Sequence, residues 1–207
     1  MEGLISLESL IKYVNTEYPH VFTIADAKRG DIGNSSSRYA KAFFEKFGFD
    51  SITVSPYMGR DSIEPFLSFE NRHTILLALT SNSGAEDFQF ISSEGRKVYE
   101  HVIVESKKWD GNENMMYVVG ATKASHLEKV RKLIPDSFLL IPGVGKQGGS
   151  LEEVSTLGLN KNIGILVNSS RGIIYASNEV DFAEKAAEEA KNLQMRMEEI
   201  LKEKLII

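Results

Sequence analysis

Short runs of β-branched and aliphatic residues alternate with amphipathic segments along the whole chain. Runs that stay apolar at consecutive positions are typical of strands buried on both faces of a sheet. Their regular alternation with helical patterns predicts parallel strands joined by helical crossovers. The predicted strands are Val21–Ala25, Ser51–Val54, Thr74–Leu79, Met116–Gly120, Phe138–Ile141 and Ile163–Val167.

The segments between these strands have apolar residues at helical spacing. In Asn34–Phe47 the apolar side chains share one face, and Gly48 is placed to end the helix. Ser125 and Glu128 predict a capping box at the start of a later helix. A final helix is expected to bury a stripe of small and apolar side chains, namely Ala183, Ala186, Ala190, Leu193 and Met197.

The first amphipathic segment, Leu4–Val14, has no predicted strand ahead of it, so the chain is expected to open on a helix. Strand–helix units behind a leading helix fit either an open doubly wound sheet or part of an eight-unit barrel. Periodicity does not choose between the two. The longest predicted loop is Thr80–Ser93, and in both architectures the loops after strands carry function.

Composition narrows the class of partner. The 207 residues are 42% hydrophobic and 26% charged, which suits one globular domain over residues 1–207. A net charge of -5 with dispersed Lys and Arg predicts a small-molecule partner and neither nucleic acid nor a membrane surface. The absence of cysteine excludes disulfides and thiolate catalysis. Without an apolar stretch of about 20 residues or signal-peptide features, a cytoplasmic protein is expected.

The segment after the first predicted strand has the most informative chemistry, Asp26-Ala27-Lys28-Arg29-Gly30-Asp31-Ile32-Gly33-Asn34. Side chains alternate along a strand, so Asp26 and Lys28 are expected to point to the same side. At the C-terminal end of a barrel strand, that side can be the mouth of the barrel. An isolated Asp-x-Lys is more often an exposed ion pair of little energetic worth, so the whole string matters more than the pair.

Two later segments suit a phosphate group. The segment Pro142–Gly149 holds four glycines, three of which match the dinucleotide pattern G-x-G-x-x-G. That interpretation needs an acidic residue at the end of the next strand, about 20 positions on, where this chain has Asn168. NAD binding is therefore not favoured. After the last predicted strand, Gly172 permits close backbone approach and Arg171 can grip a phosphate with two parallel donors.

Together these segments resemble the orotidine 5'-phosphate decarboxylases. The string from Asp26 to Asn34 is similar to the signature of the bacterial branch with longer chains, and the family has a Pro-Gly-Val-Gly-x-Gln-Gly-Gly loop like Pro142–Gly149. The resemblance implies a TIM-type (β/α)8 fold with about six of the eight strand–helix units in this chain. It also implies conversion of orotidine 5'-monophosphate to uridine 5'-monophosphate and CO2 in de novo pyrimidine biosynthesis, without cofactor or metal.

The resemblance implies roles for single residues. Lys28 would donate the proton that replaces CO2, and Asp26 would lie against the departing carboxylate and hold Lys28. Asp31 would reach into the neighbouring site of a homodimer. A fixed ammonium suits this reaction, because it stabilises the carbanion left on the ring and then neutralises it. The implied substrate-binding residues are Ser81 for the pyrimidine amide, Gln147 and Arg171 for the phosphate, and Ser35, Ile32, Pro142 and Gly172.

The match to this family begins at the first helix, and the family's first two strands have no counterpart in the 207 residues. Its ribose-binding aspartate and the second lysine of its charged array therefore match no residue here. Two other functions stay open. A sugar-phosphate lyase of the hexulose-phosphate synthase kind shares the Asp-x-Lys-x-x-Asp pattern but uses magnesium, and a nucleotide-binding remnant would bind without turnover.

Overall fold

The computed structural model describes residues 2–145 and 148–204 of the chain. These residues form two compact units, one containing residues 2–77 and 104–116, the other residues 78–103 and the described part of 117–204. No helix among the described residues is long and apolar enough to cross a membrane.

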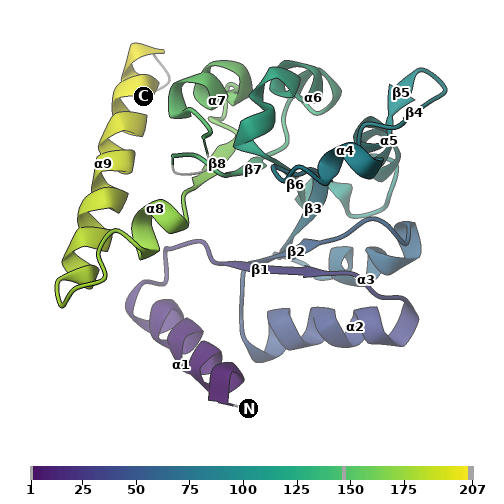
Figure 1. Ribbon diagram of the computed structural model, residues 1–207. Coiled ribbons are helices and arrows are strands. Elements are labelled where there is room, and N and C mark those ends of the chain that lie inside the picture. The colour runs from purple at the N-terminus through teal and green to yellow at the C-terminus, as the bar shows by residue number, and fades with distance from the viewer. Residues whose placement is uncertain (1, 146–147, 205–207) are drawn as a thin grey trace. The chain divides into compact units, whose positions relative to one another are not determined.

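Strands and helices alternate in the first unit, as the apolar pattern predicts. Strands β1, β2 and β3 pair in parallel, and α2 lies along β1 and β2 (Figure 1). The first helix confirms the helical prediction for Leu4–Val14. The elements are α1 (Glu2–Glu17), β1 (Ile24–Arg29), α2 (Gly33–Lys41), the π-helical turn η1 (Ala42–Lys46), β2 (Ser51–Val54), the 3-10 turn η2 (Arg60–Ser62), α3 (Glu64–Leu67), most of β3 (His73–Leu79), the end of α5 (Val98–Ser106), the 3-10 turn η3 (Asn112–Asn114) and the start of β6 (Met115–Val119).

The core of the first unit lies between this sheet and its helices. Ile52 on β2 and Ile75 on β3 are fully buried, which explains why these strands are apolar at consecutive positions. From the helical side, the ring centroid of Phe44 lies 5.2 Å from that of Phe69 and 6.5 Å from that of Phe66. Because each buried aromatic contributes about 1.5–3 kcal/mol, these side chains hold the helices to the sheet.

Strand β1 differs from its prediction. The expected range Val21–Ala25 is wrong by several residues, because the strand begins at Ile24 and continues through Arg29. Before it, the N–H and hydroxyl of Thr23 each donate to the Asp50 carboxylate at 2.8 Å, so a side chain binds this N–H, and only the Thr23 carbonyl reaches β2, by accepting the Ser51 N–H at 3.0 Å. Ladder pairing with β2 extends instead into polar residues that an apolar pattern does not detect. The Asp-x-Lys pair therefore lies on the strand itself.

The helix predicted over Asn34–Phe47 is confirmed in position but not in uniform geometry. Helix α2 passes at Ala42 into the π-helical turn η1, which ends at Lys46. Gly48 follows with a φ of +77°, a left-handed conformation that favours glycine. The prediction that Gly48 ends the helix is thus confirmed, with Phe47 as the last cap residue.

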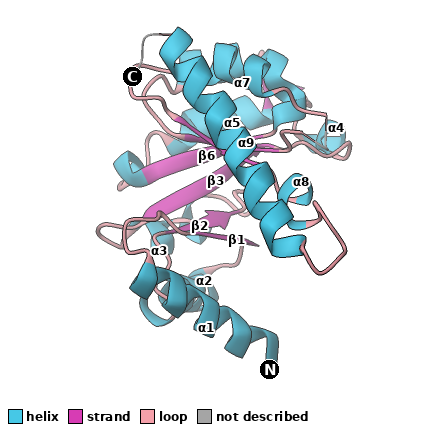
Figure 2. Ribbon diagram, turned by 90° about the vertical axis from the view of Figure 1, so that its left-hand side faces the viewer, coloured by secondary structure: helices cyan, strands magenta, loops and turns pink. Residues whose placement is uncertain are grey.

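The second unit repeats the strand–helix alternation. Strands β6, β7 and β8 pair in parallel, and α9 runs alongside α7 and α8 in both views (Figures 1 and 2). The elements are the end of β3, α4 (Ala85–Phe88), the antiparallel strands β4 (Ser92–Ser93) and β5 (Arg96–Lys97), most of α5 (Val98–Ser106), most of β6 (Met115–Val119), the 3-10 helix η4 (Ala121–His126), α6 (Leu127–Leu133), β7 (Leu139–Pro142), α7 (Leu151–Gly158), β8 (Ile165–Asn168), α8 (Arg171–Ile174) and α9 (Phe182–Glu203).

Two local predictions in this unit are wrong. The segment Thr80–Ser93 is not one loop, since it contains α4 and β4. The capping box at Ser125 and Glu128 does not form, because η4 runs directly into α6 and no side chain caps that junction. A side-chain cap does form on the next helix, α7, where the hydroxyl of Ser150 accepts a hydrogen bond from the N–H of Glu153 at 3.2 Å.

Helix α9 is less buried than predicted. Ala183 and Ala190 are exposed, although the helical stripe was expected to bury them. The helix contacts α7 and α8, and its buried side chains are Ile200 and Leu201 near its C-terminal end. A stripe of small side chains indicates which edge of a helix is apolar, but not how closely another element covers it.

Arg131 on α6 joins several backbone segments of the second unit. Its guanidinium donates to the carbonyls of Ile134 at 3.1 Å, Ser137 at 2.7 Å, Gly158 at 2.6 Å and Gly164 at 3.0 Å. Burial lowers the pKa of Arg131 to about 10, so the group stays protonated at neutral pH. The side chain thereby satisfies carbonyls near the ends of α6 and α7 that no helix bond reaches.

We expect Arg131→Met to lower the free energy of unfolding by about 3 kcal/mol, because it takes the guanidinium donor away from the carbonyls of the buried residues Ile134 and Gly158. Urea denaturation followed by circular dichroism measures the change. The matched control is Lys132→Met, which removes only the exposed pair with Glu128 and should cost about 0.5 kcal/mol or less. Equal effects of the two substitutions would show that the carbonyl contacts of Arg131 add little.

Candidate active site

The first unit contains the Asp-x-Lys pair. The Nζ of Lys28 donates to Oδ1 of Asp26 at 2.5 Å, so the two side chains lie on the same side of β1, as strand alternation predicts. The side chains are 51% and 62% exposed. An ion pair with this much solvent access contributes little to stability, so its position matters more than its strength.

The backbone at Lys28 is unusual. Ala25 pairs with Ile52 and Arg29 with Val54, so three residues of β1 face Thr53 alone, and the strand bulges. Lys28 takes a φ of +46°, a left-handed conformation that costs a residue other than glycine about 1–3 kcal/mol. Such strain is concentrated at functional sites, and here it re-aims the lysine of the motif.

Asp31, Ile32 and Ser35 follow at the start of α2. Asp31 accepts the N–H of Ile32 at 2.8 Å, and the Ile32 side chain is 56% exposed. Ile32 holds the N-cap position without a side-chain cap, so Ser35 is not the cap of this helix. Asp31, Ser35 and Arg38 line a groove of about 410 Å³ on the first unit.

Ser81 belongs to the second unit and follows β3. The hydroxyl of Thr122 donates to the Ser81 carbonyl at 3.0 Å. A Cβ placed on Gly120 would lie 2.6–2.7 Å from the N, Cα and Cβ atoms of Ser81, so only glycine fits there without a shift. The backbone N–H of Thr80 donates to Gln89, whose amide donates back to the Thr80 hydroxyl. These contacts define where Ser81 lies within this unit.

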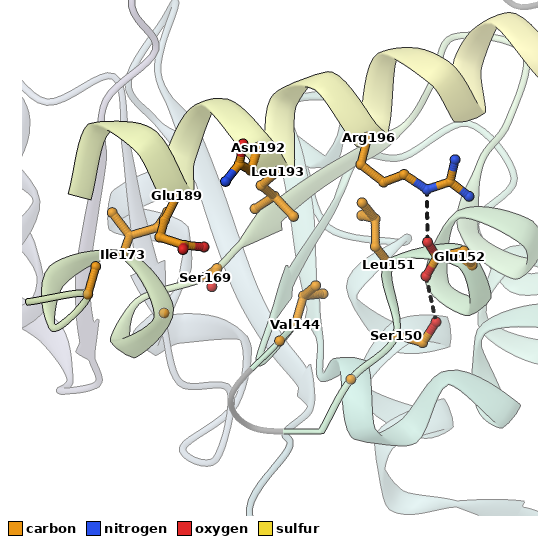
Figure 3. Close-up of a pocket in the computed structure, with 14 residues that line it drawn as sticks. Val144, Ser150, Leu151, Glu152, Ser169, Ile173, Glu189, Asn192, Leu193 and Arg196 are labelled. Atoms are coloured by element: carbon orange, nitrogen blue, oxygen red, sulfur yellow. Dashed lines mark hydrogen bonds and ion pairs between the residues drawn. The ribbon is translucent and has the colours of Figure 1, made fainter. Parts of the chain in front are cut away.

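The two phosphate-type segments meet in the second unit (Figure 3). They line one pocket of about 520 Å³, the first segment through Val144, Gly145 and Gly149 and the second through Ser169 and Gly172. The first segment starts at Pro142, the half-buried last residue of β7, and Gln147 lies outside the described residues. Arg171 is the exposed first residue of α8, directly beside the pocket-lining Gly172.

Charged side chains line the far wall of this pocket. Glu152 accepts hydrogen bonds from Arg196 Nε at 3.0 Å and from the Ser150 hydroxyl at 3.1 Å (Figure 3). Hydrogen bonds from its own backbone N–H, from Arg196 and from Ser150 lower the pKa of Glu152. The carboxylate is therefore negatively charged, and the Arg196 guanidinium balances that charge. Glu189 and Asn192 of α9 also face this space.

A second titratable cluster in this unit is not connected to the motifs. Burial tends to raise the pKa of Glu100, but hydrogen bonds from Lys129, from the Lys97 N–H and from Tyr99 lower it overall. The His126 pKa is lowered by burial and by nearby lysines. The cluster therefore joins α5 to α6 as a structural network. Among the described residues, no group of three or more His, Asp or Glu side chains could hold a metal ion.

Sequence reasoning missed Thr53, the buried residue of β2 that faces the bulge. Its hydroxyl accepts the backbone N–H of Lys28 at 2.9 Å and donates to Asp26 Oδ1 at 3.0 Å. The only signal in the sequence is a polar residue inside a strand that is otherwise apolar after its first position. That signal does not reveal which residues the hydroxyl contacts.

Comparison with solved structures identifies the class of protein. The OMP decarboxylase of Leishmania donovani aligns with a TM-score of 0.81 and 33% identity, covering 94% of this chain and 75% of its own. The UMP synthase of the same organism aligns with a TM-score of 0.83 and 35% identity over 94% of this chain and 43% of its own. The fold is of the (β/α)8 type, and the aligned structures are those of a decarboxylase, so the class is that of a (β/α)8 lyase.

Within that class, the chain belongs to the family described as Orotidine 5'-phosphate decarboxylase / HUMPS, whose model matches residues 2–186. The orotidine 5'-phosphate decarboxylase of Flavobacterium johnsoniae is 61% identical over 204 residues, which are 99% of this chain and 75% of that protein. The enzyme of the same name from Porphyromonas gingivalis is 54% identical over 206 residues, again 99% and 75%.

Proposed function

We propose that this protein converts orotidine 5'-monophosphate to uridine 5'-monophosphate and CO2 in de novo pyrimidine biosynthesis. The observation that carries the proposal is the Lys28–Asp26 pair on the bulged end of β1, in the segment with the most specific family resemblance. The high identity to two relatives named for this substrate supports it.

The pair suits the chemistry of the reaction. When the bond between the pyrimidine ring and the carboxylate breaks, CO2 departs and the electron pair stays on the ring carbon. The ammonium of Lys28 stabilises that charge and then donates a proton to the carbon, after which solvent reprotonates the amine. Asp26 favours the charged lysine, to which it is hydrogen-bonded. We also assign Asp26 a place beside the departing carboxylate. The reaction so described needs no cofactor or metal.

The remaining site residues are assigned to substrate binding. Arg171 and Gln147 bind the phosphate, beside the backbone of Pro142 and Gly172. The shared pocket of the two segments supports this assignment, since both border one space of about 520 Å³. Ser81 hydrogen-bonds the pyrimidine amide, and its close packing on Gly120 supports a defined position for its backbone and Cβ.

We also propose that the protein acts in the cytoplasm as a homodimer in which Asp31 enters the partner's site. Asp31 and Ser35 share an open groove, and the neighbouring Ile32 exposes 56% of its surface, which supports contact with a second copy. Ile32 and Ser35 would then contact substrate across the dimer. Sedimentation velocity tests the assembly, and a monomer at micromolar concentration would contradict it.

The test of the proposed function is CO2 release from orotidine 5'-monophosphate with and without EDTA. It uses the 207-residue chain beside a form extended to the full length of the Flavobacterium johnsoniae relative, since the chain spans 75% of that protein. We expect turnover by the extended form that EDTA does not change, and poor turnover by the 207-residue chain alone. Nucleotide binding without turnover by both forms, or magnesium-dependent turnover of a hexulose phosphate instead, would overturn the proposal.

A further inference from the structure

Thr53 is the only residue of β2 that faces the three-residue bulge of β1. The side chain is fully buried, and its hydroxyl is within hydrogen-bond distance of both charged residues of the motif. Burying a hydroxyl is unfavourable unless hydrogen bonds offset its desolvation, so these two contacts stabilise the buried Thr53 side chain in its observed position.

The hydroxyl has one hydrogen and can accept as well as donate. It accepts from the backbone N–H of Lys28 at 2.9 Å and donates to Asp26 Oδ1 at 3.0 Å, a shorter contact than its 3.5 Å approach to the Ala25 carbonyl. Asp26 Oδ1 in turn accepts from the Lys28 ammonium. Lys28 is therefore held at both ends, its backbone by Thr53 directly and its ammonium through Asp26.

This arrangement explains how a strained and exposed lysine keeps one position. Its φ of +46° is unfavourable, and its ion pair is half exposed, so neither feature alone would fix the ammonium. The bulge also removes the ladder partners that would normally order this backbone. The hydroxyl of Thr53 supplies an acceptor at the strained residue and a donor at its ionic partner.

We propose that Thr53 is a positioning residue for decarboxylation, acting through Lys28 and Asp26 without touching substrate. This inference rests on the proposed function. Loss of the Thr53 hydroxyl should lower the rate of the chemical step and leave nucleotide binding unchanged. A displaced proton donor slows the reaction, whereas the phosphate contacts remain.

The experiment compares Thr53→Val, which keeps the shape and removes the hydroxyl, with Thr53→Ser, which keeps the hydroxyl. Thr74→Val is the matched control, because Thr74 is a buried threonine of the neighbouring strand β3 whose hydroxyl has no partner among the described residues. We expect Thr53→Val to lower kcat about tenfold or more, with product affinity within about twofold. The serine variant and the Thr74 control should stay within about threefold of wild type.

A double-mutant cycle separates positioning from a general packing effect. In a Lys28→Ala background, adding Thr53→Val should change kcat no further, because the residue through which it acts is absent. Additive losses would overturn the inference, and so would equal losses in Thr53→Val and Thr74→Val. If the valine variant does not fold, Thr53→Ala is compared with Thr74→Ala in the same way.

A measurement independent of turnover distinguishes failure of this inference from failure of the proposed function. Amide hydrogen exchange of the Lys28 N–H should accelerate in Thr53→Val and not in Thr53→Ser or Thr74→Val, since only the first removes its acceptor. Unchanged exchange would refute the contact itself. A wild-type protein that releases no CO2 but shows the expected exchange would refute the function and keep the positioning geometry.

Discussion

Replacing Lys28 by alanine removes nearly all decarboxylation while the product nucleotide binds as before. The ammonium acts on charge that exists only as the carboxylate departs, so its loss appears in the chemical step rather than in binding. We expect kcat to fall at least about a hundredfold, within the range for a lost general acid. Steady-state CO2 release and calorimetric titration with uridine 5'-monophosphate measure the two quantities.

The control for this substitution is Lys108→Ala, which removes another exposed lysine, ion-paired with Glu105 at 2.8 Å but outside the motif. It should leave kcat unchanged. A Lys28→Ala enzyme that keeps more than about a tenth of wild-type turnover, a barrier change below roughly 1.4 kcal/mol, would rule out the proton-donor role.

Arg171→Ala and Gln147→Ala should weaken the binding of orotidine 5'-monophosphate far more than the binding of the phosphate-free nucleoside. A hydrogen bond to a charged group contributes about 1.5–3 kcal/mol, so kcat/KM for the nucleotide should fall roughly ten- to hundredfold in Arg171→Ala. Arg171→Lys keeps the charge but not the paired donors, so its kcat/KM for the nucleotide should lie between those of the wild type and Arg171→Ala. Kinetics with both substrates measure the difference.

Arg60→Ala is the matched control, because Arg60 is an exposed arginine paired with Glu64 and lies outside both phosphate segments. It should affect neither substrate. If the Arg171 and Gln147 variants weaken the binding of nucleoside and nucleotide equally, these two residues do not contact the phosphate.

The strands were predictable because their burial on both faces leaves a continuous apolar run. Ser51–Val54 agrees with β2 in both bounds, and the run from Thr74 agrees with β3 except for its first residue. The error at β1 has a physical reason, since the strand resumes its pairing with β2 at Arg29, beyond a polar bulge that gives no apolar signal. Apolar patterns report burial, and strand ends that carry chemistry are polar.

The candidate site was predictable only as segments. Alternation along a strand was enough to predict that Asp26 and Lys28 share a side, because that relation is local. The contact of Thr53 with Lys28 joins residues 25 positions apart and depends on a bulge, which no local spacing encodes. The roles of the phosphate segments came from resemblance and stay predictions, although both segments border one pocket.

The close approach of Gly120 to Ser81 limits how this protein can be re-engineered. Because even a methyl group at position 120 would overlap the backbone of Ser81, a substitution there requires a shift at position 120 or in the serine that we assign to the pyrimidine. Libraries that seek activity on modified bases should therefore vary Gly120 together with the Ser81 loop, since neither position can be optimised independently. In directed evolution the two positions form one design variable, although they lie 39 residues apart in the sequence.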